Sequence, residues 1–353
     1  MTQKVAIVTT LRNVSNSITS FLTYHLSIGF EHIFLFFDDP KDPSINEAKK
    51  FAKVSVILNN DELQDKWKQT LSYKHNKEIR EYLNSEVMAR QIVNTEIAIQ
   101  LARQKHLNWL LHIDSDELFY SPHQTVSEHF QELIDKKIFN ARYRNFEAIP
   151  ESADIEDYFK NVTLFKKNYR STYRGELKDY LSKNQKEIIN LIPQLPDDFF
   201  LFYNNGKTAA ALSEEILPWG VHGFQLPIMV CGFKLPILQK QIPQWQTNVS
   251  SPLILHYPCN GFENFWKKYE TLGLFPNQWY GKIDIANAMG SFHLEARDIV
   301  MSGNKKAAKE FYEKRVVINN AADIKSCMEN DLFCRIVKPS KLLTEISIYS
   351  HSL

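Results

Sequence analysis

The stretch Trp109-Leu-Leu-His-Ile-Asp-Ser-Asp-Glu-Leu-Phe-Tyr120 decides the fold, because an apolar run typical of a buried strand ends abruptly in three carboxylates. Asp114, Asp116 and Glu117 would repel one another at a sheet edge if all three were ionised, unless water, basic groups or a divalent metal compensated them. In an extended chain Asp114 and Asp116 point to the same side. The pattern therefore predicts a metal that bridges a pyrophosphate, and the alternative is an acidic turn that caps a strand.

The composition excludes several classes of protein. The 42 Lys and Arg residues nearly balance the 41 Asp and Glu residues, so no field of one sign indicates nucleic acid or an anionic membrane as the main partner. The four cysteines lack CxxC spacing, which argues against a zinc ribbon or a dense disulfide framework. No stretch approaches the roughly twenty apolar residues of a membrane span, so we expect a soluble, cytoplasmic chain without a transmembrane segment.

The first third of the chain alternates between strand and helix patterns, which predicts a parallel sheet flanked by helices. Helices are expected around residues 15–28, 45–52 and 78–105, and a loop with some helix over 59–77. The strands are expected at Val5–Val8, Ile33–Phe37, Val54–Leu58 and Trp109–Ile113. Ligands bind at the carboxyl ends of strands in such sheets, so the polar residues that follow three of these strands should share one rim.

The second half has a different character, with shorter strands and more aromatic residues. We expect a helix at 125–136, a strand at Val162–Phe165, a turn at Gly206-Lys207 and an aromatic amphipathic helix at Phe262–Leu272. His222 and His256 each follow an apolar run at a strand or loop end. The length of 353 residues fits one elaborate domain over 1–300 with a C-terminal helical extension over 301–353.

Four blocks in this order resemble the metal-dependent glycosyltransferases of the GT-A fold, in particular the family 2 and family 92 types. Together they cover about three quarters of the chain, which is far more specific than Asp-x-Asp alone. The blocks are Leu11-Arg-Asn13 with Tyr24-His25, Gly29 and His32 to Asp39; Arg90-Gln91 and Asn94 before His112 to Glu117; Asn205-Gly-Lys207 with Gly220 to Phe224; and Leu255-His-Tyr257 before Phe265 to Gly273.

The resemblance implies a GT-A (Rossmann-like) fold with a mixed, mainly parallel sheet. Residues 1–120 would form the half that binds the nucleotide-sugar, and residues 121–300 the half that binds the acceptor. The donor would be a UDP-sugar, the cofactor Mn²⁺ or Mg²⁺, and the acceptor a glycan or another molecule with a hydroxyl group. Transfer would be inverting.

The resemblance also assigns roles to single residues. Asp116 would be a catalytic metal ligand, with Asp114 as a second ligand or a ribose contact, and His256 as a third ligand for which His222 is the alternative. A core histidine is the competing interpretation of His256. The nucleotide and its phosphates would be bound by Thr9, Thr10, Arg12, Asp38, Asp39, Arg90, Gln91, Asp114 and Lys207.

An inverting transfer needs a base that removes the proton of the acceptor hydroxyl. Glu147 is the first candidate, because it follows the strand after the acidic motif, and Asp179 and Glu263 come behind it. Two other functions stay open. A nucleotidyltransferase of related fold would normally carry a Gly-rich basic loop after the first strand, and Leu11-Arg-Asn13 lacks those glycines. The second open function is that of a catalytically inactive relative that binds glycan.

Overall fold

The computed structural model describes residues 2–14, 17–170, 176–196, 198–212, 215–221, 223–230, 233–237, 251–279, 283–285 and 290–350. The chain forms two compact units, and each is assembled from two segments of the sequence. The first unit comprises residues 1–143 and 206–244, and the second comprises 144–205 and 245–353. The functional halves expected at 1–120 and 121–300 stay a prediction, and residues 301–353 belong to the second unit.

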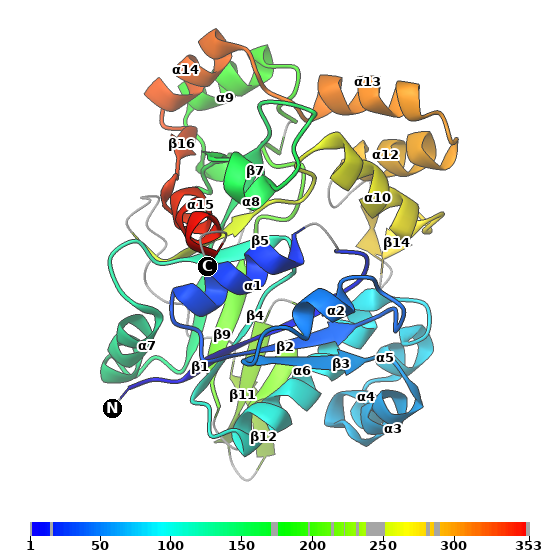
Figure 1. Cartoon of the computed structure of the whole chain (residues 1–353), viewed down its shortest axis with the longest axis vertical. Coiled ribbons are helices and arrows are strands. Elements are labelled where there is room, and N and C mark those ends of the chain that lie inside the picture. The colour runs from blue at the N-terminus through cyan, green and yellow to red at the C-terminus, as the bar shows by residue number, and fades with distance from the viewer. Residues whose placement is uncertain are drawn as a thin grey trace. The chain divides into compact units, whose positions relative to one another are not determined.

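The first unit is built on a six-stranded sheet with the strand order β3-β2-β1-β4-β9-β6 (Figure 1). Strands β3, β2, β1 and β4 run parallel to one another, as in one half of a Rossmann fold, and β9 runs antiparallel to both β4 and β6. This confirms the mixed α/β fold with a mainly parallel sheet. The strands are β1 (Val5–Leu11), β2 (His32–Phe37), β3 (Val54–Leu58), β4 (Trp109–His112), β6 (Asn140–Tyr143) and β9 (Lys207–Ala211).

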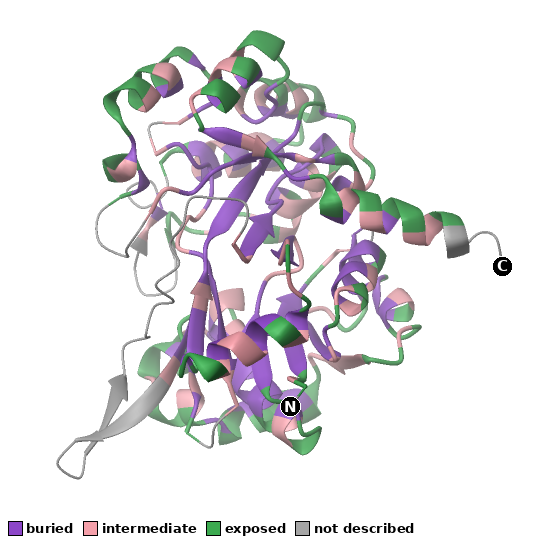
Figure 2. Ribbon diagram, turned by 90° about the vertical axis from the view of Figure 1, so that its left-hand side faces the viewer, coloured by how far each residue is buried: buried purple, intermediate pink, exposed green. Residues whose placement is uncertain are grey.

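Continuous apolar runs explain the central strands of this sheet. Every residue of β1, β2 and β4 is buried, which is expected where helices cover both faces of a parallel sheet. Figure 2 shows buried residues in purple along strands inside the molecule and exposed residues in green on helices and loops. The strands expected at Ile33–Phe37, Val54–Leu58 and Trp109–Ile113 are confirmed within one residue at each end, and β1 extends three residues beyond the expected Val8.

The helices of the first unit depart from the expected pattern in two places. The stretch expected to be mainly loop holds two helices, whose first turns are capped by the side chains of Asn60 and Thr70. The single helix expected over 78–105 is two helices, separated by residues 83–86, where the Ser85 hydroxyl donates to the carbonyl oxygen of Tyr82 at 3.4 Å. The helices are α1 (Ile18–Ser27), α2 (Ile45–Ala48), α3 (Asp61–Gln69), α4 (Leu71–His75), α5 (Lys77–Tyr82), α6 (Val87–Gln104) and α7 (Val126–Asp135).

Four further strands, among those that the structure describes, complete the first unit. Strand β5 (Glu117–Tyr120) begins at Glu117, the last carboxylate of the acidic motif. An antiparallel ribbon in the order β10-β11-β12 consists of β10 (Leu217–Trp219), β11 (Gly223–Val230) and β12 (Phe233–Ile237). The prediction of a turn at Gly206-Lys207 is wrong for Lys207, because this residue begins β9 and lies opposite Tyr143 of β6.

In the second unit, strands β7, β8, β13 and β16 form a small mixed sheet. Strand β7 runs parallel to β13 and antiparallel to β8, which in turn runs antiparallel to β16. The strands of this sheet are β7 (Asn145–Ile149), β8 (Leu164–Lys166), β13 (Leu253–His256) and β16 (Phe333–Arg335). Strands β14 (Gln278–Trp279) and β15 (Ile283–Asp284) pair with each other in a separate antiparallel sheet.

Helices surround this sheet and include the expected aromatic helix, which is confirmed as α10. They are α8 (Tyr158–Asn161), the 3₁₀ helix η1 (Leu177–Tyr180), α9 (Lys183–Leu191), α10 (Phe262–Leu272), α12 (Phe292–Met301), α13 (Lys305–Arg315), α14 (Ala321–Glu329) and α15 (Lys338–Ser350). Helices α13, α14 and α15 lie within the C-terminal helical extension expected over 301–353. In the part of the chain that the structure describes, no helix is long and apolar enough to cross a membrane.

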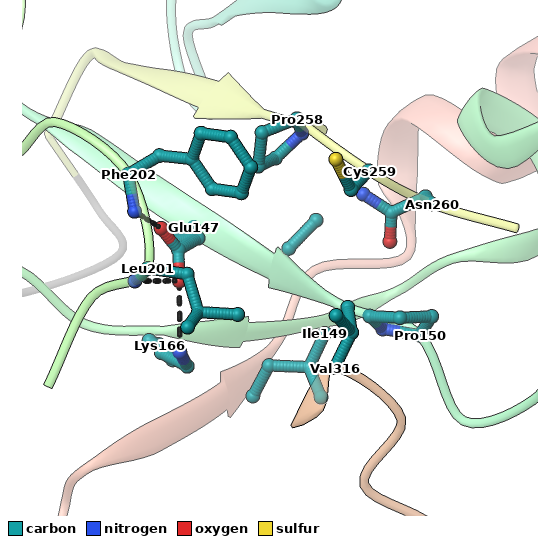
Figure 3. A pocket seen from close by; sticks show the side chains of 11 residues that line it. Glu147, Ile149, Pro150, Lys166, Leu201, Phe202, Pro258, Cys259, Asn260 and Val316 are labelled. Carbon is teal, nitrogen blue, oxygen red and sulfur yellow. Dashed lines mark hydrogen bonds and ion pairs between the residues drawn. The ribbon is translucent and has the colours of Figure 1, made fainter. Parts of the chain in front are cut away.

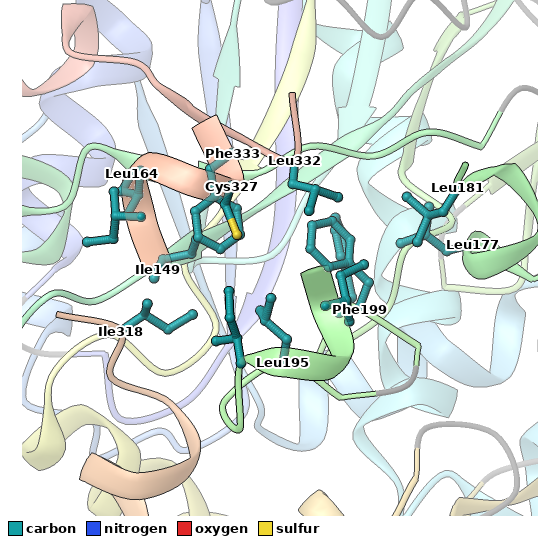
Figure 4. Close-up of a cluster of buried hydrophobic side chains, with 14 residues drawn as sticks. Ile149, Leu164, Leu177, Leu181, Leu195, Phe199, Ile318, Cys327, Leu332 and Phe333 are labelled. Carbon is teal, nitrogen blue, oxygen red and sulfur yellow. The ribbon is translucent and has the colours of Figure 1, made fainter. Parts of the chain in front are cut away.

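A hydrophobic cluster joins the sheet of the second unit to its helices (Figure 4). Ile149 of β7, Leu164 of β8 and Phe333 of β16 contribute from the sheet, and Phe199 and Cys327 pack with them. Burial of such side chains contributes about 25 cal/mol per Å² of apolar surface, so this cluster stabilises the unit strongly. Cys327 is a free thiol, as are Cys259 and Cys334, and Cys231 lies outside the described residues.

His25 links helix α1 to strand β5 inside the first unit. Its Nδ1 lies 2.8 Å from the carbonyl oxygen of Phe21, and its Nε2 lies 3.1 Å from the amide nitrogen of Phe119. The ring therefore carries its proton on Nδ1 and accepts a hydrogen bond at Nε2. Burial lowers the pKa of His25 to about 3, although the hydrogen bond to Phe21 favours the protonated form.

We expect the free energy of unfolding to fall less on acidification in the His25→Gln variant than in the wild type. Between about pH 6.5 and pH 3 the unfolded chain binds a proton at His25 and the folded chain does not, so the free energy of unfolding falls as the pH falls. This residue should account for about 2 kcal/mol between pH 7 and pH 5. Urea denaturation at both pH values measures the effect. An equal pH dependence in the two proteins would contradict a neutral, buried ring.

Candidate functional site

The carboxyl ends of the parallel strands bring polar side chains together at one edge of the first unit's sheet. Asp38 follows β2, and the motif that contains Asp114, Asp116 and Glu117 follows β4. We call this set of four carboxylates the acidic edge. Because β9 runs antiparallel to β4 and its Thr208 lies opposite His112, β9 delivers its first residue, Lys207, to the same edge.

Asp114 is held from both sides by side chains of other elements. Its Oδ1 accepts a hydrogen bond from Nε2 of Gln91 at 2.9 Å, and its Oδ2 lies 2.5 Å from Nζ of Lys207. Asp114 retains 25% of its side-chain exposure, whereas Lys207 has 0%. Burial opposes the charge on Lys207, but Asp114 and Glu117 outweigh it, so the pKa of Lys207 is raised. A charged lysine is therefore built into the acidic edge.

Glu117 points into the protein and closes the turn after β4. Its Oε2 accepts a hydrogen bond from the backbone N–H of Asp114 at 2.7 Å and lies 3.6 Å from Nζ of Lys207. Burial raises the pKa of Glu117 well above its ordinary value, Lys207 opposes that rise, and the charges of Asp114 and Asp116 add to it. Glu117 therefore shapes the motif from inside, while Asp116 is partly exposed.

Asp38 and Arg90 form a two-pronged ion pair. Nε and Nη2 of Arg90 lie 2.5 and 2.8 Å from the two carboxylate oxygens of Asp38, and Nη1 donates to the carbonyl oxygen of Leu83 at 2.8 Å. The Asp38 side chain is only 8% exposed. A planar guanidinium suits this geometry, and the pair locks the end of β2 to helix α6. The partner of Arg90 in the structure is thus a carboxylate, and the expected contact of Arg90 with the nucleotide or its phosphates stays a prediction.

Asn94 of α6 connects the end of β1 to helix α3. Its Nδ2 donates to Oγ1 of Thr10 at 3.0 Å, and its Oδ1 accepts from Nε1 of Trp67 at 2.6 Å. Thr9 is fully buried, and its hydroxyl has no hydrogen-bond partner among the described residues. Thr10 is thus oriented by α6, and a nucleotide contact by Thr9 or Thr10 stays a prediction.

The loops that follow β1 and β2 are tied to each other by Asp42, which sequence reasoning missed. Its carboxylate accepts hydrogen bonds from the backbone N–H of Asn13 and, at 2.9 Å, from that of Ser44. The local signal is Asp-Pro-Ser after a strand, a pattern that favours an Asx turn. Asp39 accepts from the N–H of Lys41 at 2.9 Å, and Arg12 is exposed beside these loops.

In the second unit, the carboxylate of Glu147 in β7 is buried and accepts hydrogen bonds from three neighbouring groups (Figure 3). Its Oε1 accepts from Nζ of Lys166 at 2.8 Å and from the N–H of Leu201 at 3.0 Å, and its Oε2 accepts from the N–H of Phe202 at 2.8 Å. The residue is 2% exposed. These contacts hold the segment around residues 201–202 against β7 and β8. The role of Glu147 as base stays a prediction.

The other sequence candidates in the second unit lie in ordinary structural settings. His256 ends β13 and is buried, with its ring 4.5 Å from that of Tyr203 between centroids. Asp179 accepts from the N–H of Glu176 at 2.8 Å and caps η1. Glu263 is exposed and pairs with Lys305 at 2.9 Å. His222, the alternative metal ligand, lies outside the described residues.

A divalent cation can be tested against these contacts. Among the described residues, no three His, Cys, Asp or Glu side chains gather in a group that could hold a metal. Asp114 contacts Gln91 and Lys207, Glu117 points inward, and Asp116, like Asp114, is partly exposed. Mg²⁺ often binds one or two carboxylates and completes its shell with substrate phosphates and water. The acidic edge therefore fits a cation that is shared with a diphosphate.

Comparison with known proteins places the chain near one class of enzyme. No protein-family model matches it. Two proteins of Arabidopsis thaliana, both named glycosyltransferase-like, are 26% and 24% identical to it over 343 residues. The chain is similar to glycosyltransferase-like proteins. The alignments cover 92% of this chain, and 68% and 60% of the two relatives, so the chain spans about two thirds of their length.

Three solved structures are similar to parts of the chain. One is CMP:2-keto-3-deoxy-manno-octonic acid synthetase complexed with CTP, with a TM-score of 0.23 and 13% identity over 48% of this chain and 61% of that one. HddC from Yersinia pseudotuberculosis has a TM-score of 0.21 and 13% identity over 47% and 68%. Glucosyl-3-phosphoglycerate synthase from Mycobacterium tuberculosis, in complex with Mn²⁺, UDP and glucosyl-3-phosphoglycerate, has a TM-score of 0.24 and 11% identity over 60% and 57%. TM-scores this low support no conclusion about this chain.

We expect Arg90→Met to lower the free energy of unfolding by about 3 kcal/mol, because it leaves the carboxylate of Asp38 buried without its counter-charge. The double variant Asp38→Asn with Arg90→Met should recover part of that loss, since the uncompensated charge is then gone. Urea denaturation of the wild type, both single variants and the double variant gives the coupling energy. An Arg90→Met protein as stable as the wild type would show that the pair does not lock β2 to α6.

Proposed function

We propose that this chain is a glycosyltransferase of the GT-A type that moves a sugar from a nucleotide-sugar, a UDP-sugar in the first place, to a hydroxyl group of a glycan or similar acceptor. The observation that carries the proposal is the acidic edge at the carboxyl ends of parallel strands, in a chain that is similar to glycosyltransferase-like proteins over 92% of its length. Open α/β sheets bind nucleotides at this end of their strands.

The reaction moves one bond at the anomeric carbon of the sugar. The acceptor oxygen attacks that carbon, the bond from the carbon to the diphosphate oxygen breaks, and the electron pair leaves with the diphosphate. The proton of the acceptor hydroxyl passes to a base. In an inverting transfer, attack and departure take place on opposite faces of the sugar. Negative charge therefore grows on the diphosphate, and the site must neutralise it.

Asp116 is the residue that we assign to a divalent cation, Mn²⁺ or Mg²⁺. When bound, the cation would neutralise charge on the departing diphosphate. Its partial exposure and its place in the turn after β4 support this assignment, because a ligand can approach it from solvent. His256 as a further ligand is part of the same proposal and rests on the resemblance alone.

The remaining residues of the edge would bind and orient the nucleotide. Asp38 is fixed by Arg90, and Asp114 by Gln91 and Lys207, so both carboxylates are held in place for hydroxyl groups of the ribose. Arg12 is exposed in the loop after β1 and can pair with a phosphate. Fixed side chains of this kind lower the entropy cost of binding.

Replacement of Asp116 by Asn should reduce turnover of a UDP-sugar at least 100-fold, because removal of one group that stabilises the transition state commonly has an effect on the order of 100-fold or more. Ser115→Ala is the matched control, since it changes the neighbouring residue and leaves every carboxylate. Release of UDP from the donor, with and without acceptor glycans, is the measurement. Retained activity in the Asp116→Asn protein would remove the proposed role, and release of pyrophosphate from a nucleoside triphosphate would favour a nucleotidyltransferase instead.

The variant Glu147→Gln distinguishes a general base from a carboxylate whose role is structural. The contacts of Glu147 support a structural role. The variant should therefore lower the free energy of unfolding by about 2 kcal/mol, since the Lys166 ammonium loses a charged partner. Its turnover per folded molecule should stay within about tenfold of the wild type, whereas loss of a general base typically costs about 100-fold or more. Lys166→Met is the companion variant, because it breaks the same ion pair and leaves the carboxylate. A large loss of turnover in a well-folded Glu147→Gln protein, with Lys166→Met active, would identify Glu147 as the base.

A further inference from the structure

Lys207 is a buried ammonium group inside a site that is expected to attract metal. Its side chain is completely buried, and its Nζ lies 2.5 Å from Oδ2 of Asp114 and 3.6 Å from Oε2 of Glu117. The pairing of β9 with both β4 and β6 fixes this position, because Lys207 is the first residue of β9 and lies opposite Tyr143. The lysine is therefore part of the sheet and not a mobile surface side chain.

The lysine compensates the motif before any ligand arrives. Asp114 already has an amide donor, Gln91, on its other oxygen, at 2.9 Å. Glu117 accepts a hydrogen bond from the backbone N–H of Asp114 and points into the protein. A divalent cation that took Asp114 as a ligand would have to displace Lys207, and the displaced ammonium would stay buried without its nearest carboxylate, which is costly.

We propose that Lys207 is the built-in counter-ion of Asp114 and withholds this carboxylate from a divalent cation until the diphosphate of the donor supplies further ligands. The inference rests on the proposed function for the identity of the donor. One carboxylate and water hold such a cation weakly, and the oxygens of a diphosphate supply the missing ligands. Metal and nucleotide therefore strengthen each other's binding, and each changes the affinity of the other by the same factor.

Binding of Mn²⁺ to the full chain tests this without any turnover. The free Mn²⁺ signal in electron paramagnetic resonance is titrated with wild-type protein alone and with protein saturated with UDP, and UDP without protein serves as the blank. The expected result is an affinity for Mn²⁺ at least tenfold higher in the presence of UDP, and loss of that gain in Asp116→Asn. Tight binding of Mn²⁺ by the wild-type protein without nucleotide would overturn the proposal.

Lys207→Met is the second arm, because it removes the ammonium and keeps a side chain of similar length. Mn²⁺ should then bind the nucleotide-free protein about tenfold more tightly than it binds the wild type, since Asp114 becomes available as a ligand. Lys207→Arg keeps the charge and should retain the dependence on UDP. Unchanged affinity in a folded Lys207→Met protein would overturn the counter-ion role. If UDP binds neither with nor without Mn²⁺, the proposed function fails, while the comparison of nucleotide-free proteins still decides the role of Lys207.

Discussion

The ion pair between Asp114 and Lys207 is the interaction on which the rest of the candidate site depends. It joins the end of a parallel strand, β4, to the start of an antiparallel strand, β9, and Gln91 connects helix α6 to the same carboxylate. Without a positive group in this place, three carboxylates within four residues would destabilise the edge of the sheet. Lys207 allows the strand to end in acidic residues and still leaves Asp116 at the surface.

The same physical solution recurs in both units. Asp38 is paired with Arg90 in the first unit and Glu147 with Lys166 in the second, and each carboxylate is almost completely buried. Buried charges persist only when they are paired and hydrogen-bonded, and the loss of one partner costs much more than the pair contributes. The pairs therefore fix the positions of strand ends and loops, and this rigidity is what a site needs if it is to hold a nucleotide and a sugar in reacting positions.

Local pattern was enough to predict the four parallel strands and the edge at which they end. The runs at Ile33–Phe37 and Val54–Leu58 are short, rich in apolar residues and closed by polar residues, which leaves little freedom in placing strands. Strand β9 was missed because Lys207 precedes Thr208 and three alanines, and alanine has a weak preference for strands. The partners of Asp38 and Glu147 were missed for another reason: they lie 52 and 19 residues away, and only the three-dimensional fold brings them together.

The central claim is that the acidic edge binds a nucleotide-sugar, and the melting temperature of the protein tests it most directly. A panel of UDP-sugars and GDP-sugars would be measured with and without Mn²⁺, because a ligand at 100 times its dissociation constant stabilises the folded state by about 2.7 kcal/mol. We predict that one UDP-sugar raises the melting temperature, and that it does so more with Mn²⁺ than without. A melting temperature that no nucleotide or nucleotide-sugar changes, with or without the metal, would contradict the claim.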